Sequence, residues 1–140
     1  MARLWFCEAD TTAGRIGDMH HLGQKNLKDI EGDAFLIYQP QKRGSKKVSA
    51  PVQEALAREL DLHDLSRKTF LVTEHGKPSA NSGSLDNRVR KWIKRAGLVD
   101  LNGRVTHSQH GSRNGVATAM GEDGSSLFEI MALLGHSDPR

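Results

Sequence analysis

Two residues that could bind a phosphate stand three positions apart, His110 and Arg113, within residues 105–113. Side chains at i and i+3 are neighbours on one face of a helix. Ser108 is expected to cap the start of this helix, which places His110 in the first turn, where free backbone N–H groups and the helix dipole favour an anion. A guanidinium, an imidazole and a helix N-terminus directed at one point predict a phosphate site.

A second imidazole, His136, follows a helix whose limits are marked in the sequence. Ser126 and Glu129 form a capping-box pattern at its start, and Gly135 is expected to end it. The apolar positions between them have helical spacing: Leu127, Ile130, Met131 and Leu134. His136 is therefore expected to leave a fixed helix end and to point back at the phosphate site.

The residues around these groups decide how a His-x-x-Arg pair is interpreted, because such a pair also occurs by chance in many helices. Arg113 is followed by Ala117-Thr118, and the last helix ends in Leu134-Gly135-His136. This order resembles the C-terminal catalytic boxes of the tyrosine recombinases, the phage integrase family. Ser112 departs from the pattern, because the family usually has Leu beside the arginine. The resemblance extends over residues 11–138.

A further arginine, Arg15, belongs to an earlier box that the family writes as Thr-Gly-x-Arg, with an acidic residue three positions later. Arg15 and Asp18 fit this box, whereas Gly14 stands one place later than the usual glycine. Gly14 is expected to allow a turn with positive φ, and Asp18 to hold the Arg15 guanidinium in position. Taken alone, the pair is better explained as an exposed ion pair of little energetic value; the downstream boxes favour the site.

A lysine-containing hairpin is expected between two strands, at residues 34–38 and 47–50, with a turn at 39–46. A solvated basic hairpin is the simplest interpretation. The resemblance implies instead that one lysine reaches the active site, and it favours Lys42 over Lys46. A helix over residues 51–60 is expected to follow, starting at Pro51.

The chemistry that the resemblance implies is metal-free phosphoryl transfer by five residues: Arg15, Lys42, His110, Arg113 and His136. Arg15 and Arg113 would bind the non-bridging oxygens bidentately. His110 would contact the phosphate and act as acid or base, and Lys42 would protonate the leaving 5′ oxygen. His136 would donate to another phosphate oxygen, and Asp18 would orient Arg15 or an imidazole.

The family's nucleophile is a tyrosine shortly after the Gly-His box, and these 140 residues contain none in that place. The single tyrosine, Tyr38, lies in the first predicted strand and is interpreted as a half-buried strand residue. Residues 1–140 are therefore expected to be one catalytic domain, incomplete at both ends. It would bind a DNA phosphate without cutting it, so whether it is an enzyme by itself stays uncertain.

A basic helix is predicted after Ser84 and is expected to end at Gly97. Its apolar face is predicted to hold Leu85, Val89, Trp92, Ile93 and Ala96. Its other face could be a solubilising surface or could contact the DNA backbone. The candidate nucleic-acid-binding residues, here and in the hairpin, are Arg43, Lys46, Arg88, Lys91 and Arg95.

Composition sets wider bounds. The fold implied by the resemblance is α+β, mainly helical with a small antiparallel sheet. A net charge of +3 does not by itself indicate nucleic acid, and no apolar run is long enough for a membrane span. One cysteine, Cys7, excludes an internal disulfide framework and fits the cytoplasm. His20 and His21 lack the spacing of a metal site and are expected at the surface; no cofactor or metal is expected.

Three functions remain open at this stage. The favoured one is a recombinase domain that acts on double-stranded DNA together with other protomers. A catalytically inactive DNA-binding remnant or regulator is the second, and a type IB topoisomerase-like domain is a related chemistry that the Leu-Gly-His-Ser ending makes less favoured. The third is a small helical interaction domain whose boxes match by accident.

Overall fold

The computed structural model describes residues 1–137 and has the expected α+β fold, mainly helical with one small antiparallel sheet. In chain order the elements are α1 (Ala2–Thr12), α2 (Ile16–Met19), the 3₁₀ turn η1 (Gln24–Asn26), β1 (Leu27–Ile30), β2 (Asp33–Tyr38), β3 (Val48–Pro51), α3 (Glu54–Leu60), α4 (Ser82–Arg95), α5 (Gln109–Glu122) and α6 (Leu127–Leu134). None of these helices combines the length and hydropathy that a membrane span requires.

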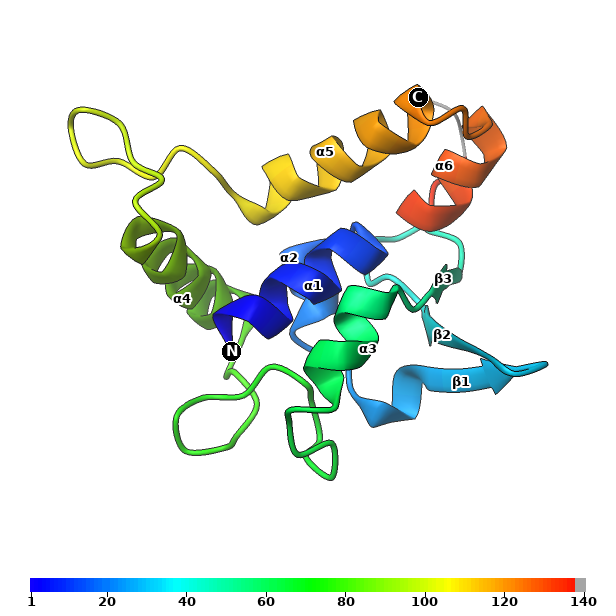
Figure 1. Ribbon diagram of the computed structural model, residues 1–140, viewed down its shortest axis with the longest axis horizontal. Coiled ribbons are helices and arrows are strands. Elements are labelled where there is room, and N and C mark those ends of the chain that lie inside the picture. Colours follow the sequence, from blue (N-terminus) through cyan, green and yellow to red (C-terminus); the bar gives the residue numbers. More distant parts are fainter. Residues whose placement is uncertain (138–140) are drawn as a thin grey trace.

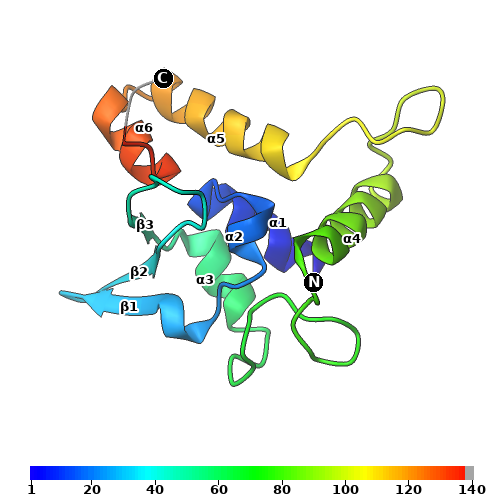
Figure 2. The same ribbon diagram turned by 180° about the vertical axis from the view of Figure 1, so that it is seen from behind.

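Helix α1 lies at the centre, between α3, α4, α5 and β3 (Figure 1). It ends at Thr12, and Ala13 follows it in the left-handed conformation. Leu4, Trp5 and Ala9 are buried on its inner side and join the core formed with the sheet and α4. Helix α2 follows α1 after the turn at residues 13–15, contacts α4, and carries the chain towards the sheet (Figure 2).

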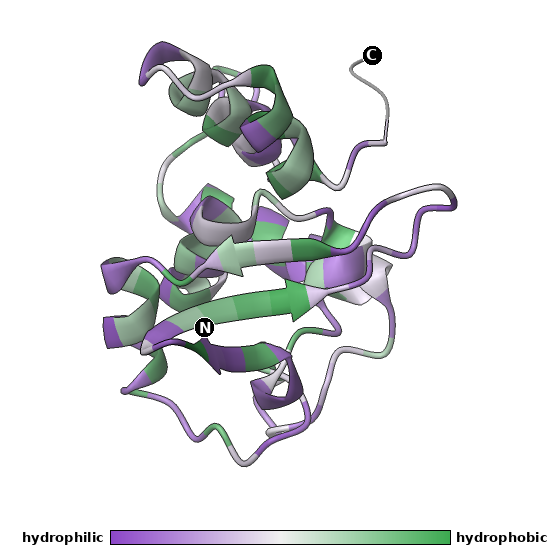
Figure 3. Ribbon diagram, turned by 90° about the vertical axis from the view of Figure 1, so that its right-hand side faces the viewer, coloured by the Kyte–Doolittle hydropathy of each residue, from purple (hydrophilic) through white to green (hydrophobic). Residues whose placement is uncertain are grey.

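The sheet has the order β1-β2-β3, and both pairings are antiparallel. Leu36 on the middle strand faces Leu27 and Ala50 across the two pairings. Strand β1 was not predicted, because its Leu-Lys-Asp-Ile sequence is largely exposed and polar, whereas β2 is the most apolar strand (Figure 3). The turn between them uses positive φ at Glu31 and Gly32, as two-residue hairpins favour.

Two predicted boundaries were wrong. Pro51 ends β3, where it pairs with Phe35, so α3 begins only at Glu54. In α4 the cap is Asn81 rather than Ser84: the Asn81 side chain accepts a hydrogen bond of 2.8 Å from the Ser84 N–H. Asn favours such caps as strongly as Ser does, so sequence pattern alone did not separate the two.

The last two helices agree with the prediction at their ends. The Ser108 side chain accepts from the Gly111 N–H at the start of α5, and Ser126 and Glu129 form the capping box of α6. Gly135 ends α6 with φ 69°. No residue of α6 is buried, and α6 contacts the rest of the domain mainly through β3 and α5. The end of α6 is thereby placed over the hairpin between β2 and β3 (Figure 1).

Candidate phosphate-binding site

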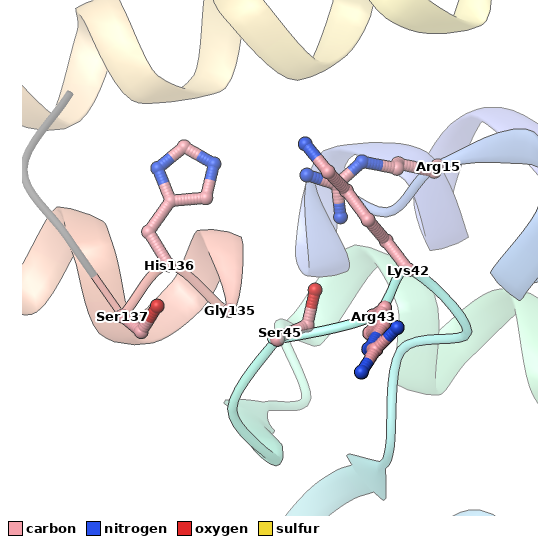
Figure 4. A pocket seen from close by; sticks show the side chains of 8 residues that line it. Arg15, Lys42, Arg43, Ser45, Gly135, His136 and Ser137 are labelled. Atoms are coloured by element: carbon pink, nitrogen blue, oxygen red, sulfur yellow. The ribbon is translucent and has the colours of Figure 1, made fainter.

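A polar cavity of about 220 Å³ lies where three distant segments meet: the start of α2, the hairpin loop between β2 and β3, and the end of α6. It is lined by Arg15, Lys42, Arg43, Gly44, Ser45, Gly135, His136 and Ser137. The Arg15 and Lys42 side chains extend into the space that faces the His136 ring (Figure 4). Three of the five predicted catalytic residues therefore line one cavity, and its charged groups are cationic, as an anion site requires.

Arg15 emerges from a tight turn between α1 and α2. The left-handed residue of this turn is Ala13, with φ 48°, and not Gly14 as expected. Gly14 matters instead for space, because a Cβ there would lie 3.0 Å from Met19 Cγ and 3.0 Å from Thr12 Oγ1. Arg15 itself is the extended N-cap of α2, and its buried Nη1 has no partner within residues 1–137. This atom is a donor that an anion could use.

Arg113 is buried and connects two of the three segments. It donates through Nη1 to the Ala13 carbonyl at 2.6 Å and through Nη2 to the Leu134 carbonyl at 2.8 Å. Burial, followed by the nearby Arg15 charge, lowers the pKa of Arg113. Arg113 thus holds the Arg15 turn and the end of α6 together, and part of its donor set is already used by the protein.

The His136 ring lies beside this guanidinium, with Nε2 3.3 Å from Arg113 Nη2. Burial lowers the pKa of His136, and the charges of Arg113, Arg15 and Lys42 lower it further. The imidazole is therefore neutral at neutral pH. Because Nε2 faces an N–H donor, it is assigned as the acceptor, and Nδ1 carries the proton. A neutral His136 can still donate this proton to a phosphate oxygen.

The loop that carries Lys42 is held by a backbone hydrogen bond on each side of the lysine. The Gln41 N–H donates to the Asp18 carboxylate at 2.7 Å, and the Lys46 N–H donates to the Gly135 carbonyl at 2.9 Å. Asp18 therefore holds the lysine loop, and within residues 1–137 it forms neither a hydrogen bond nor an ion pair with Arg15, contrary to expectation. Lys46 contributes its backbone and does not line the cavity, so the geometry favours Lys42, as the resemblance did.

His110 is exposed on the first turn of α5 and does not line the cavity. The reason is the face that α5 turns inwards. Gln109 and Arg113, four residues apart, are its buried residues, and a neighbour of Gln109 points about 100° away from it. His110 and Arg113 stand about 60° apart round the helix, but only Arg113 is on the buried side, so the structure does not bring His110 to the cavity.

The predicted DNA-contacting residues fall into two groups. Arg88 belongs to the packing of α4, because it donates to the Val72 carbonyl at 2.8 Å and lies 5.0 Å from the Trp92 ring centroid. Its guanidinium thus has partners inside the protein, whereas the sequence pattern placed it among the residues that contact DNA. The other candidates are exposed: Arg43, Lys46, Lys91 and Arg95.

Tyr38 forms part of the floor beneath the Arg15 turn. It is 7% exposed, and its hydroxyl is 3.6 Å from where a Cβ on Gly14 would stand. Burial, and then the nearby Asp18 charge, raise the pKa of Tyr38 to about 12. Tyr38 is therefore a fully packed, protonated residue rather than a half-buried one, which agrees with its not being a nucleophile.

Sequence reasoning missed one buried polar residue near the site and placed one histidine wrongly. Gln109 is buried and bonded across the fold, but nothing local distinguishes it from any polar residue at a helix start. His20 is buried, whereas both histidines of the His-His pair were expected at the surface. The rings of His20 and His21 lie 3.7 Å apart between centroids.

Comparison with known proteins gives consistent relationships. The profile of the phage integrase family matches residues 2–140. The tyrosine recombinase XerD of Staphylococcus aureus is 28% identical over 137 residues, which is 91% of this chain and 43% of XerD. The chain thus spans less than half the length of this curated relative.

Solved structures share the fold. A lambda integrase dimer bound to a COC′ core site has a TM-score of 0.73 at 22% identity and covers 99% of this chain and 50% of its own. XerA recombinase has a TM-score of 0.70 at 20% identity, with the same two coverages of 99% and 50%. Together with the match over nearly the whole chain, the cavity of convergent cations places this protein: it belongs to the phage integrase family.

Proposed function

We propose that this domain binds the scissile phosphodiester of double-stranded DNA and takes part in strand cleavage and rejoining during site-specific recombination. The observation that carries the proposal is the convergence of Arg15, Lys42 and His136, which lie up to 121 positions apart in the chain, on one cavity. Arg113 lies directly behind them, with Nη2 3.3 Å from His136 Nε2. Cations from separate elements can contact several oxygens of one phosphate, whereas a basic surface helix cannot enclose one.

Each residue has a distinct part in the proposed chemistry. Arg15 and the remaining donors of Arg113 would stabilise charge that develops on the non-bridging oxygens. His136 would donate its Nδ1 proton to one of these oxygens, and Lys42 would give a proton to the leaving 5′ oxygen. His110 would join the site only if DNA binding turned the first turn of α5 towards the phosphate. The attacking tyrosine of the family, which would form a 3′-phosphotyrosyl bond, cannot be the buried Tyr38.

We also infer the partners from the relatives. Lambda integrase has been solved as a dimer on a core site and as a tetramer on a Holliday junction, which supports double-stranded DNA and further recombinase protomers as partners of this chain. The free thiol of Cys7 fits a reducing compartment, and we place the protein in the cytoplasm.

Salt-dependent DNA binding tests the proposal. A duplex is titrated with the wild type, Arg15→Ala and a matched control, Arg58→Ala, which removes the same charge from an exposed Glu54 pair on α3. We expect Arg15→Ala to weaken binding about tenfold and to lower the slope of log K against log salt by about one. The control should bind within about twofold of the wild type. Equal affinities for the two variants would refute the proposed phosphate site.

A further inference from the structure

Gln109 is a buried polar residue that connects α5 to two other segments. It is 4% exposed, and its Nε2 donates to the Gly14 carbonyl at 2.9 Å. Its Oε1 accepts from the Trp5 indole N–H of α1. Both ends of the amide are therefore satisfied, across sequence separations of 95 and 104 residues. A buried amide with both ends bonded has one preferred orientation, because turning it would leave polar groups unpaired.

The Gly14 carbonyl is not an incidental acceptor, because it belongs to the same planar peptide group as the Arg15 N–H. A hydrogen bond to this carbonyl therefore also sets the orientation of the peptide group that carries the Arg15 Cα. Arg113 donates to the preceding carbonyl, that of Ala13, at 2.6 Å. Two side chains one helical turn apart on α5 thus bind consecutive carbonyls of the Arg15 turn, and Ala13 in that turn has positive φ.

We propose that Gln109 is a positioning residue for Arg15: its side chain holds the Gly14–Arg15 peptide so that the guanidinium faces the cavity. This inference rests on the proposed function, because it assigns Gln109 a role only if Arg15 binds phosphate. It adds a residue that does not itself contact the cavity. It also gives α5 a role in the site besides that of carrying Arg113.

A double-mutant cycle with inorganic phosphate tests this role. Phosphate affinity is measured from the Nε–H signals of the arginines by NMR for the wild type, Gln109→Met, Arg15→Ala and the combined variant. Methionine fills a similar volume but cannot donate to the Gly14 carbonyl. We expect Gln109→Met and Arg15→Ala each to weaken phosphate binding about tenfold, and the combined variant to bind no more weakly than Arg15→Ala alone.

The matched control is Trp5→Phe, which removes the other hydrogen bond of Gln109 and disturbs the same core. It should keep phosphate affinity within about twofold of the wild type, because the bond to Gly14 remains. If Gln109→Met does not fold, Gln109→Asn keeps the amide and shortens its reach, and the same loss is expected. Loss of affinity from Arg15→Ala but not from the Gln109 variants would overturn this inference alone. A further loss in the combined variant would do the same, and no loss from Arg15→Ala would overturn the proposed function with it.

Discussion

Replacing Arg113 with alanine is expected to loosen the fold as well as the phosphate site. Arg113 donates to two carbonyls, those of Ala13 and Leu134, at 2.6 and 2.8 Å. A hydrogen bond from a charged donor contributes about 1.5–3 kcal/mol, so losing both should lower the free energy of unfolding by about 3–6 kcal/mol. This is a large share of the about 5–15 kcal/mol that stabilises a typical domain.

The effect should be concentrated in α6, because no residue of that helix is buried and the Leu134 carbonyl is one of its few anchors. Amide hydrogen exchange of residues 127–136 should therefore quicken more than that of α1. Urea unfolding gives the global change, and exchange gives the local one. Arg113→Lys should show an intermediate loss, because one ammonium group cannot reach both carbonyls in the same geometry.

Arg95→Ala is the control for charge alone, since Arg95 is exposed at the end of α4 and should change stability by less than about 0.5 kcal/mol. If the free energy of unfolding of Arg113→Ala is within about 1 kcal/mol of the wild-type value and the amides of α6 stay protected from exchange, Arg113 does not hold the Arg15 turn and the end of α6 together. Its effect on DNA binding would then reflect phosphate contact only.

Three other changes have expected outcomes. Ala13→Gly should raise the free energy of unfolding by up to about 1 kcal/mol, because Ala13 has a positive φ of 48°. Gly14→Ala should lower it by about 1–3 kcal/mol, because the added Cβ would crowd Met19 and Thr12. Urea unfolding measures both changes, and two changes of the same sign would contradict this expectation. Burial raises the pKa of Glu8 well above 4.5, so the folded state keeps a proton that the unfolded state has lost. Wild-type stability relative to Glu8→Gln should thus be greatest below pH 4.5 and fall by about 1.4 kcal/mol per pH unit until the folded-state pKa is passed; parallel pH profiles would argue against a buried neutral acid. Asp18→Ala removes the acceptor of the Gln41 N–H, so hydrogen exchange of this amide should quicken about tenfold or more, while exchange of the β1 amides stays unchanged. If the Gln41 amide exchanges equally slowly in the variant and the wild type, Asp18 does not hold the lysine loop.

Features that depend on neighbouring residues could be predicted from sequence. The caps at Ser108 and Ser126 and the left-handed Gly135 are set by side chains and φ preferences within one helical turn, and all three are found. The order of the boxes also located Arg15, Lys42 and His136, which the structure brings to one cavity.

Features that depend on distant approach could not be predicted. Asp18 accepts from the backbone N–H of Gln41, which is 23 positions away. No local pattern could show that this group, and not the Arg15 guanidinium, is the partner of Asp18. Gln109 gains its role only when α5 meets the turn after α1. The need for glycine at position 14 also comes from distant packing, since a Cβ there would crowd Met19 and lie 3.6 Å from the Tyr38 hydroxyl.

Gly135 lets the end of α6 approach the hairpin between β2 and β3 closely. Its carbonyl accepts from Lys46, and a Cβ there would stand 3.1 Å from the Lys46 carbonyl oxygen and 3.2 Å from Pro40. The contacts that fix the distance between the Lys42 loop and His136 therefore involve neither the Arg43 side chain nor the Ser45 side chain. Substitution of Arg43 or Ser45 would therefore change the lining of the cavity while leaving this main-chain contact between the hairpin and α6 in place.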